Sequence, residues 1–513
     1  MKKMNISWRI LAGLMVLFFY LLTDNNKVEA FSHYHLGFHG FLGEPSKIPS
    51  LRGAEPMDMW FKQRLDHFSS TLSSTWKQRY FVNDKYYRND SAAPIFLLIG
   101  GEAEAAKHWM YSGAWIKYAE HFGALCFQLE HRFYGQSHPT ANLSNANLKY
   151  LTSKQALADL ANFVKAMKEE YNLGAKQKWI AFGGSYPGSL AAWFREKYPD
   201  LIYGSISSSA PLLAKVDFKE YFEVVKKSLA TYKPQCVEAV GRGFVQIEIL
   251  LRHMIGQRNL DEKFKTCSPI KDSINNDLDI ANLFENVASN FAGVVQYNKD
   301  NTNHSKVNID EICDIMVNTR IGPPVDRLAA VNALLMKQSE ENCLDYKYDK
   351  MIETMQEISW DSIAAKGMRQ WTWQTCNEFG FYQTAENKTD TFGDRFKVDF
   401  FIKQCMDIYG DSMNYEYLNR VVGKTNQFYG GLKPSTTNVL YVHGSTDPWH
   451  SLGLINAQNR KTPTIYIEGT AHCADMYEPV TTDPQQLIAA RHKILRYLAT
   501  LLTDYKATSF IVN

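Results

Sequence analysis

The chain has 513 residues, 45% of them hydrophobic and 13% aromatic, so it suits two or three domains and can bury a large core. Its formal net charge is only +2. The composition is that of a globular protein, and it gives no indication of a nucleic-acid partner or of a polybasic membrane contact.

The first 30 residues have the pattern of a secretory signal peptide. Lys2, Lys3 and Arg9 precede an unbroken apolar run over residues 10–22, and small residues close to Ala30 offer a cleavage site. The apolar run is short for a membrane span and no later segment is long enough, so we expect a soluble lumenal or secreted protein without a membrane contact after cleavage. A signal anchor is the alternative.

All eight cysteines follow the signal peptide, and an even count in an exported chain predicts disulfides. No Cys-x-x-Cys motif is present, so we do not expect a metal cluster or a redox dithiol. Four Asn-x-Ser/Thr glycosylation acceptors agree with export. They are Asn89, Asn142, Asn303 and Asn387.

Residues 179–194 predict a strand-turn-helix elbow with Ser185 at its tip. A hydroxyl becomes a useful nucleophile when it is held clear of the backbone, beside a general base and near N–H donors that stabilise an oxyanion. Gly183 provides the small residue needed where strand and helix nearly touch. Pro187 stands where the commoner pattern has glycine, and proline is accepted in the first turn of a helix. The alternative is a glycine-rich turn with an incidental serine.

Two backbone N–H groups are candidates for the oxyanion hole. Tyr186 follows the nucleophile and supplies the first N–H. The second is expected from the glycine pair that ends the strand-like segment 95–99, and we assign it to Gly101. A simple β-turn at Gly100 and Gly101 is an equal alternative.

Strand-like and helix-like segments alternate from residue 95 to residue 207, which predicts a mostly parallel sheet. The first two strands, before this region, have the pattern of antiparallel edge strands. Residues 130–137 mix charged and aromatic side chains at a strand end and predict a buried polar network near the site, with a solvated loop as the alternative. The strands are expected at residues 60–68, 75–82, 95–99, 123–129, 179–184, 202–207, 438–444 and 464–469.

Between about residue 216 and about residue 415 the sequence becomes helix-like, and six of the eight cysteines fall there. We therefore expect a helical insertion with its own disulfides. The expected division is a signal peptide at 1–30, a leader or flexible segment at 31–55, two parts of an α/β-hydrolase domain at 56–213 and 418–513, and a helical cap at 214–417.

The acid and the base of a catalytic triad are expected on loops at the ends of the last two strands. Asp447 and His472 occupy these places, in the chain order that the fold requires. His472 would take the proton of Ser185 and later give it to the leaving amine, while Asp447 fixes the imidazole tautomer. Ser185 would form an acyl-enzyme, and no metal or organic cofactor is needed.

Three nearby residues compete for these roles. His443 is expected to point along its strand, and His450 lies too close in sequence to Asp447 to be its partner. Asp475, three residues after His472, is expected to order that loop.

Four segments resemble the serine carboxypeptidase family that includes lysosomal Pro-X carboxypeptidase, dipeptidyl peptidase II and thymus-specific serine protease. They are residues 130–137, 183–186, 373–382 and 447–449, and they span nearly the whole mature chain. Residues 184–193 are most similar to the thymus-specific members.

This resemblance implies an α/β-hydrolase domain with an inserted cap, the triad named above, and peptides trimmed from one end, often at proline, in acidic compartments. It places Trp449 as the aromatic residue of a proline pocket, and an ordinary core tryptophan is the alternative. The implied disulfides join Cys236 to Cys313, Cys267 to Cys343 and Cys376 to Cys405, and leave Cys126 and Cys473 unassigned.

Ser189 departs from the family pattern. It stands where the proline-selective members have a pocket-lining methionine, which leaves the proline preference open. We expect an exported serine exopeptidase, a carboxypeptidase or a dipeptidyl-peptidase, in lysosomes or endosomes or outside the cell. The alternatives are a catalytically silent hydrolase-fold binding protein and an esterase or lipase. The peptide end that is attacked, the pH optimum and a possible homodimer stay open.

Overall fold

A computed structural model describes residues 42–45, 56–299, 307–387, 390–456 and 462–502. The predicted signal peptide, nearly all of the predicted leader and the Asn303 acceptor lie outside these residues. None of the helices in the described ranges is long and apolar enough to cross a membrane.

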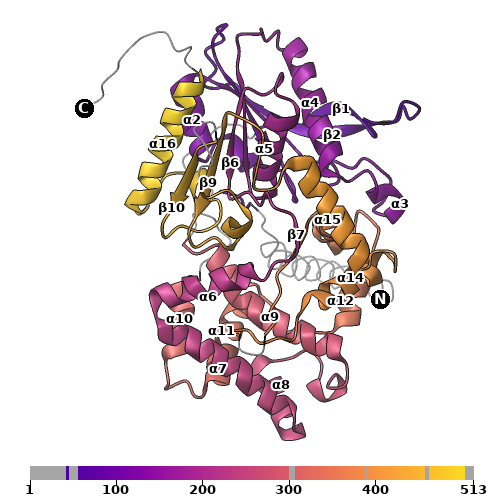
Figure 1. Cartoon of the computed structure of the whole chain (residues 1–513), viewed down its shortest axis with the longest axis vertical. Coiled ribbons are helices and arrows are strands. Elements are labelled where there is room, and N and C mark those ends of the chain that lie inside the picture. Colours follow the sequence, from indigo (N-terminus) through magenta and orange to yellow (C-terminus); the bar gives the residue numbers. More distant parts are fainter. Residues whose placement is uncertain (1–41, 46–55, 300–306, 388–389, 457–461, 503–513) are drawn as a thin grey trace, which may run out of the picture.

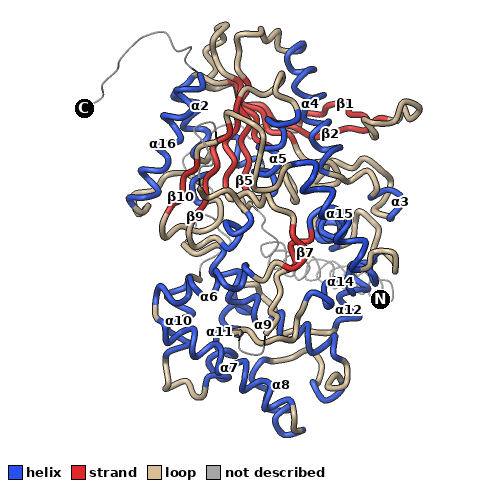
Figure 2. The backbone as a smooth tube through the Cα atoms, viewed as in Figure 1, coloured by secondary structure: helices blue, strands red, loops and turns tan. Residues whose placement is uncertain are grey.

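A central sheet of eight strands forms the upper part of the molecule (Figures 1 and 2). Its order is β1-β2-β4-β3-β5-β6-β9-β10, and every pairing is parallel except β1 with β2 and β2 with β4. The strands are β1 (Met59–Arg64), β2 (Thr75–Asn83), β3 (Ile95–Ile99), β4 (Leu125–Leu129), β5 (Trp179–Gly184), β6 (Gly204–Ser208), β9 (Val439–Gly444) and β10 (Thr464–Ile467).

The sheet has an apolar layer on each face, because successive side chains of a strand point to opposite sides. In β3, Ile95, Leu97 and Ile99 pack with α4 and α5, whereas Phe96 and Leu98 pack with α2 and α16. Both faces are covered, which explains the unbroken apolar sequence of β3. The covering helices are α2 (Ala114–Phe122), α4 (Ser153–Glu170), α5 (Tyr186–Lys197) and α16 (Gln485–Leu502).

The parallel sheet and the expected strands are present, so the fold is the α/β-hydrolase type with an inserted cap. One expectation was wrong in detail. We expected the first two strands to be edge strands, but only β1 lies at the edge, since β2 also pairs with β4. A short helix, α3 (Asn145–Leu148), follows β4.

The cap is a group of helices below the sheet in Figure 1, inserted between β6 and β9. Asn276 caps α9 by accepting two backbone N–H bonds, and Asn308 and Glu311 form a reciprocal capping box at the start of α10. The helices are α6 (Glu220–Tyr232), α7 (Pro234–Leu251), α8 (Met254–Phe264), α9 (Asp277–Gln296), α10 (Ile309–Val317), α11 (Pro324–Gln338), α12 (Tyr348–Gln356), α13 (Met368–Gln374), α14 (Val398–Tyr409) and α15 (Tyr415–Tyr429).

The cap region is not wholly helical. Two short strands, β7 (Lys215–Asp217) and β8 (Gly380–Tyr382), pair in parallel, and a π-helix, Thr375–Phe379, comes just before β8. Residue 417, where we expected the cap to end, lies inside α15. The apolar core of the cap is continuous with the α4 and α5 side of the sheet, so the two parts share one core.

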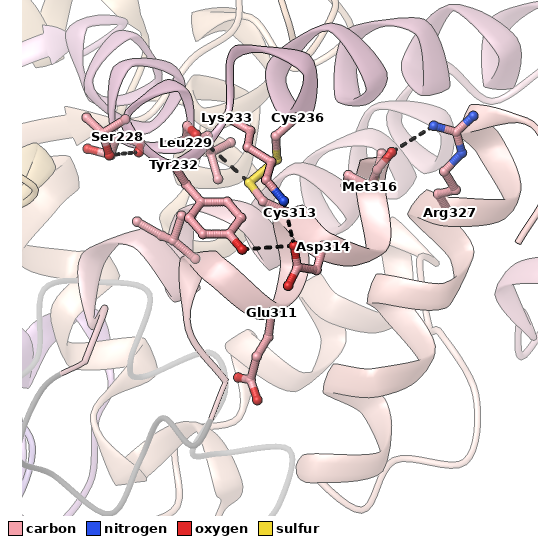
Figure 3. Close-up of a disulfide and its surroundings, with 12 residues drawn as sticks. Ser228, Leu229, Tyr232, Lys233, Cys236, Glu311, Cys313, Asp314, Met316 and Arg327 are labelled. Atoms are coloured by element: carbon pink, nitrogen blue, oxygen red, sulfur yellow. Dashed lines mark hydrogen bonds and ion pairs between the residues drawn. A yellow bond between two sulfur atoms is a disulfide. The ribbon is translucent and has the colours of Figure 1, made fainter. Parts of the chain in front are cut away.

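Three disulfides hold the cap helices, and they are the pairs that the family resemblance implied. They join Cys236 to Cys313, Cys267 to Cys343 and Cys376 to Cys405. Figure 3 shows the first, which links α7 to α10. The two remaining cysteines, Cys126 and Cys473, are buried and unpaired.

Substitution of Gly183 by alanine should strongly destabilise the protein. A Cβ atom at this position would overlap the carbonyl group of Pro187, which is backbone and has no room to move. We expect a loss of at least about 1–3 kcal/mol in unfolding free energy, measured by thermal and urea unfolding. Gly293→Ala in α9 is the matched control, because its Cβ meets nothing within 4 Å and the helix should gain up to about 1 kcal/mol. Equal stability of the two variants would contradict this account.

Candidate active site

Ser185 lies in the sharp turn between β5 and α5. Its backbone has φ 65° and ψ −134°, which L residues adopt at a cost, and its N–H donates to the carbonyl of Ser208 at 2.9 Å. The residue is only 3% exposed. A strained serine at the carboxyl end of a central parallel strand has the geometry of a nucleophile elbow.

The loop after β3 packs directly on the first turn of α5. A Cβ at Gly101 would overlap the ring of Pro187. The glycine therefore leaves space for Pro187, which stands where the elbow usually has a glycine. Tyr186 is the first residue of α5, and an N–H at that position has no acceptor within its own helix. The two predicted oxyanion donors, Tyr186 and Gly101, therefore belong to segments in contact with each other.

His472 and Asp447 are joined by a buried hydrogen bond. Nδ1 of His472 donates to Oδ1 of Asp447 at 2.9 Å, and the same oxygen accepts the backbone N–H of Trp449 at 3.0 Å. The two side chains are 1% and 0% exposed. With Nδ1 acting as donor, Nε2 is the ring nitrogen that can accept a proton.

The electrostatics of this pair favour its charged form. Burial works against charge on both groups, but the attraction between them is stronger, so the pKa of His472 is raised and the pKa of Asp447 is lowered. The Ser209 hydroxyl also acts to lower the pKa of Asp447. The pair is therefore suited to stabilise an imidazolium that forms during a reaction.

Ser208 and Ser209, at the end of β6, connect the three segments that carry the predicted triad residues. The Ser208 carbonyl accepts from the N–H of Ser185, and the Ser209 hydroxyl accepts from the N–H of Cys473, beside His472, at 2.9 Å. The N–H of Ser209 donates to Val442 of β9, the strand that leads to Asp447, at 2.7 Å. We refer to this pair as the Ser208–Ser209 corner.

The cap contributes to the site through Gln296, the last residue of α9, which is fully buried. Its side-chain oxygen accepts from Nε1 of Trp449 at 2.8 Å and from the hydroxyl of Tyr221 at 2.7 Å. Its backbone carbonyl accepts from the N–H of His472 at 2.9 Å. One cap residue thus contacts the loops that carry both the acid and the histidine.

A chain of hydrogen bonds supports the side chain of Tyr186. Burial lowers the pKa of His131 to about 4, so this ring is neutral, donates from Nδ1 to the carbonyl of Arg132 and accepts from the Tyr186 hydroxyl at Nε2. The Tyr186 oxygen also accepts from Gln374, which in turn accepts from Tyr134. The polar network expected at residues 130–137 is therefore present, and it fixes Tyr186, the residue next to the predicted nucleophile Ser185.

The same segment holds two buried ion pairs. Arg132 binds both carboxylate oxygens of Asp159 at 2.6 Å, and Glu130 binds Arg79 at 2.5 Å. Each carboxylate is thus compensated by a guanidinium, as buried charges require.

The two predicted pocket residues are buried. Trp449 is 2% exposed and packs against Phe218, Tyr221 and Phe381, with ring centroids 5.4–5.8 Å away. Ser189 donates its hydroxyl to the carbonyl of Pro211 at 2.8 Å. Their roles toward a substrate stay predictions.

The competing residues have other partners or surroundings. Asp475 accepts from the Ser208 hydroxyl at 2.6 Å, in keeping with a role in ordering its loop. His443 is buried with its ring against Gly453, and His450 packs on Tyr466. Of the glycosylation acceptors, Asn89 and Asn387 are exposed and Asn142 is half-buried.

Comparison with known proteins identifies the family. The family model of serine carboxypeptidase S28 matches residues 63–494. The chain belongs to this family. It is 34% identical to the thymus-specific serine protease of Mus musculus, over 88% of this chain and 89% of that one. It is 25% identical to the lysosomal Pro-X carboxypeptidase of Homo sapiens, over 90% and 91% of the two chains.

Membership of the S28 family makes the chain a serine-type peptidase, and the expected resemblance is confirmed. The identity is higher to the thymus-specific relative than to the Pro-X relative, in line with residues 184–193. The disulfides fit the oxidising secretory pathway.

Sequence reasoning missed Gln296 and the Ser208–Ser209 corner. Gln296 ends an apolar helix and carries no local signal, because its partners lie 75 and 153 residues away. The corner had one available signal, the serine-rich run at residues 205–209, which has four serines in five residues.

Asp447→Asn should lower kcat by about 10³- to 10⁴-fold, because an amide cannot stabilise the imidazolium. Loss of the carboxylate should also lower the pKa of His472 and move the acid limb of kcat/KM to lower pH. Steady-state kinetics across pH would measure both effects.

Asp475→Asn is the control for Asp447→Asn, since Asp475 also lies close to His472 but bonds Ser208. Asp475→Asn should lower kcat by only a small fraction of the decrease that Asp447→Asn causes. A larger loss from Asp475→Asn than from Asp447→Asn would assign the acid of the site to Asp475.

Proposed function

We propose that this serine peptidase is an exported exopeptidase that cleaves small peptides through Ser185, His472 and Asp447. The observation that carries the proposal is the buried His472–Asp447 hydrogen bond, on loops tied through the Ser208–Ser209 corner to the strained Ser185 turn. These are the parts that acyl transfer by a serine requires.

In this mechanism, Ser185 Oγ attacks the scissile carbonyl while Nε2 of His472 accepts the hydroxyl proton. The N–H groups of Tyr186 and Gly101 stabilise the oxyanion of the tetrahedral intermediate. His472 then protonates the leaving amine, the peptide C–N bond breaks and the acyl group stays on Ser185. Water, deprotonated by His472, releases the acid and restores the serine.

The cap supports the exopeptidase mode. Ser185, His472 and Asp447 are each at most 3% exposed, and cap residue Gln296 lies against the histidine and acid loops. A site so enclosed favours the end of a short peptide over a folded protein. Trp449 and Ser189 are the proposed lining of the substrate pocket.

A defined peptide mixture, half of it with proline near one end, tests this function by mass spectrometry at acidic and neutral pH. The wild type should release short fragments from one terminus, and Ser185→Ala should release none because it lacks the nucleophile. A fluorophosphonate probe should label the wild type only.

Cleavage within long peptides would contradict the exopeptidase mode. Hydrolysis of short acyl esters without any peptide cleavage would favour an esterase. The absence of both reactions and of labelling would favour a binding protein.

The proposed location is the secretory pathway, either lysosomes or endosomes or outside the cell, and the raised carboxyl pKa values support an acidic compartment. Burial raises the pKa of five carboxyl groups into the range of about 6 to 8. Their stabilisation is complete below the ordinary carboxyl pKa and is lost as the pH rises through these values. The groups are Glu102, Glu285, Glu341, Glu378 and Asp475.

Two buried histidines set the lower limit of the pH range in which the protein is most stable. Burial lowers the pKa of His131 and His443 to about 4, so their contribution is lost as the pH falls from their ordinary range through that value. We expect the melting temperature to rise between pH 8 and pH 6 and to fall again below about pH 4.5, measured by scanning calorimetry.

Glu378→Gln should reduce the rise between pH 8 and pH 6, because a neutral amide replaces a carboxyl whose pKa burial raises to about 7. Glu357→Gln, the same change at an exposed site, should keep the dependence of melting temperature on pH that the wild type has. A melting temperature that is constant from pH 8 to pH 6 would contradict the assignment.

A further inference from the structure

Glu102 is a buried carboxyl group that the mechanism above does not use. It follows Gly101 in the loop after β3 and is only 3% exposed. Its Oε1 atom has no hydrogen-bond partner among the described residues. A buried polar atom without a hydrogen bond destabilises the folded state, so a native site that keeps one calls for a ligand or another explanation.

The titratable groups that interact electrostatically with Glu102 come from three segments of the proposed active site. His472 acts on it from the loop after β10, Tyr186 from α5 and Tyr134 from the loop after β4. Neither tyrosine carries charge near neutral pH, since burial raises the pKa of both far above the ordinary value. Within the described residues, no lysine or arginine acts on the Glu102 carboxyl.

Because no lysine or arginine compensates it, the carboxyl is held neutral. Burial raises the pKa of Glu102 to about 8, and the charge of His472 only partly opposes this shift. Below that pH, Glu102 therefore carries an O–H group, which is a hydrogen-bond donor. A carboxylate is the acceptor that such a donor binds most strongly, in a short charge-assisted bond.

We propose that Glu102 binds the free carboxylate at the end of a peptide substrate, so that the enzyme removes residues from the carboxyl end. This inference rests on the proposed function, because it places Glu102 on the side of the leaving group. His472 protonates the leaving amine, and Glu102, which follows Gly101 in the loop after β3, has a carboxyl group close enough to interact electrostatically with that histidine.

The covalent geometry of a peptide fits this placement. The amide nitrogen and the carboxyl carbon of a single leaving residue are two bonds apart, about 2.5 Å. A group that lies beside both the oxyanion loop and His472 is thus within reach of the terminal carboxylate when one residue leaves. The amino terminus of the substrate would lie on the acyl side, away from the amine that His472 protonates.

The test compares peptides that differ only at the carboxyl terminus, as the free acid or the amide, in wild type, Glu102→Gln and Glu102→Leu. The wild type should favour the free acid by about 10- to 100-fold in kcat/KM, the range of a charge-assisted hydrogen bond. Glu102→Leu should lose this preference through a higher KM for the acid. Glu102→Gln, which keeps an N–H donor, should retain part of it.

The pH dependence separates the donor role from simple packing. In the wild type, the preference for the free acid should decline as the pH rises above about 8, where Glu102 ionises. Glu102→Gln should show no such decline. Glu285→Gln is the control, because it makes the same change at a half-buried carboxyl of the cap that bonds Ser289. It should keep the acid-to-amide ratio of the wild type and the decline of that ratio with pH.

Peptides with an acetylated amino terminus test the opposite ligand, an ammonium group. If acetylation abolishes cleavage while amidation does not, and Glu102→Gln is as defective as Glu102→Leu, Glu102 binds the amino terminus and the inference is wrong. An acid-to-amide ratio that is unchanged in both variants also overturns it. If the wild type cleaves no peptide at all, the proposed function fails first. Should Glu102→Leu not fold, Glu102→Gln and its pH profile decide alone.

Discussion

The proposed catalytic arrangement depends on one backbone corner, Ser208–Ser209 at the end of β6. This corner lies between the strand that delivers Ser185 and the strand that leads to Asp447, and its polar groups bond to both neighbours and to the residue after His472. Ser209 has a positive φ of 49°, so the chain bends sharply here and leaves the sheet. Three loops that are far apart in sequence are thereby held by bonds to two adjacent residues.

The corner also marks the point where the chain leaves the sheet toward the cap. Gln296 of the cap contacts the same loops that the corner holds. Because Gln296 bonds Trp449, Tyr221 and the backbone of His472, the cap supports the catalytic loops as well as covering them. The shared apolar core of the cap and the α4 and α5 layer has the same effect on a larger scale. A displacement of the cap should therefore shift His472 directly, through the hydrogen bonds of Gln296.

Much of this architecture was predictable because its causes are local. The strand β3 is a run of five apolar residues, α4 has helical apolar spacing and a Thr152 cap, and the elbow has a required order of small residues. Asp447 and His472 could be found because parallel strands bring their carboxyl ends to one edge of the sheet. These features need only neighbouring residues or a general rule of topology.

What could not be predicted depends on contacts between distant segments. The pairing of β7 with β8 joins residues 215 and 380, which are too far apart for any local pattern to reveal. The neutral state of Glu102 follows from burial under other segments, and a sequence shows only an acidic residue after two glycines. The acceptor role of Gln296 also depends on a contact between distant segments. Its side chain becomes a buried acceptor only because α9 packs against the loops that follow two later strands.

The two ends of the cap connect to β6 and β9, which are hydrogen-bonded neighbours in the sheet. An insertion of some two hundred residues therefore begins and ends at one place on the sheet and leaves the pairing of β6 with β9 intact. The bonds of Gln296 and the common core are contacts separate from this connection. A transplant of this cap onto another hydrolase would carry over the connection but not those contacts, so the recipient would keep its fold and lose the support of its histidine.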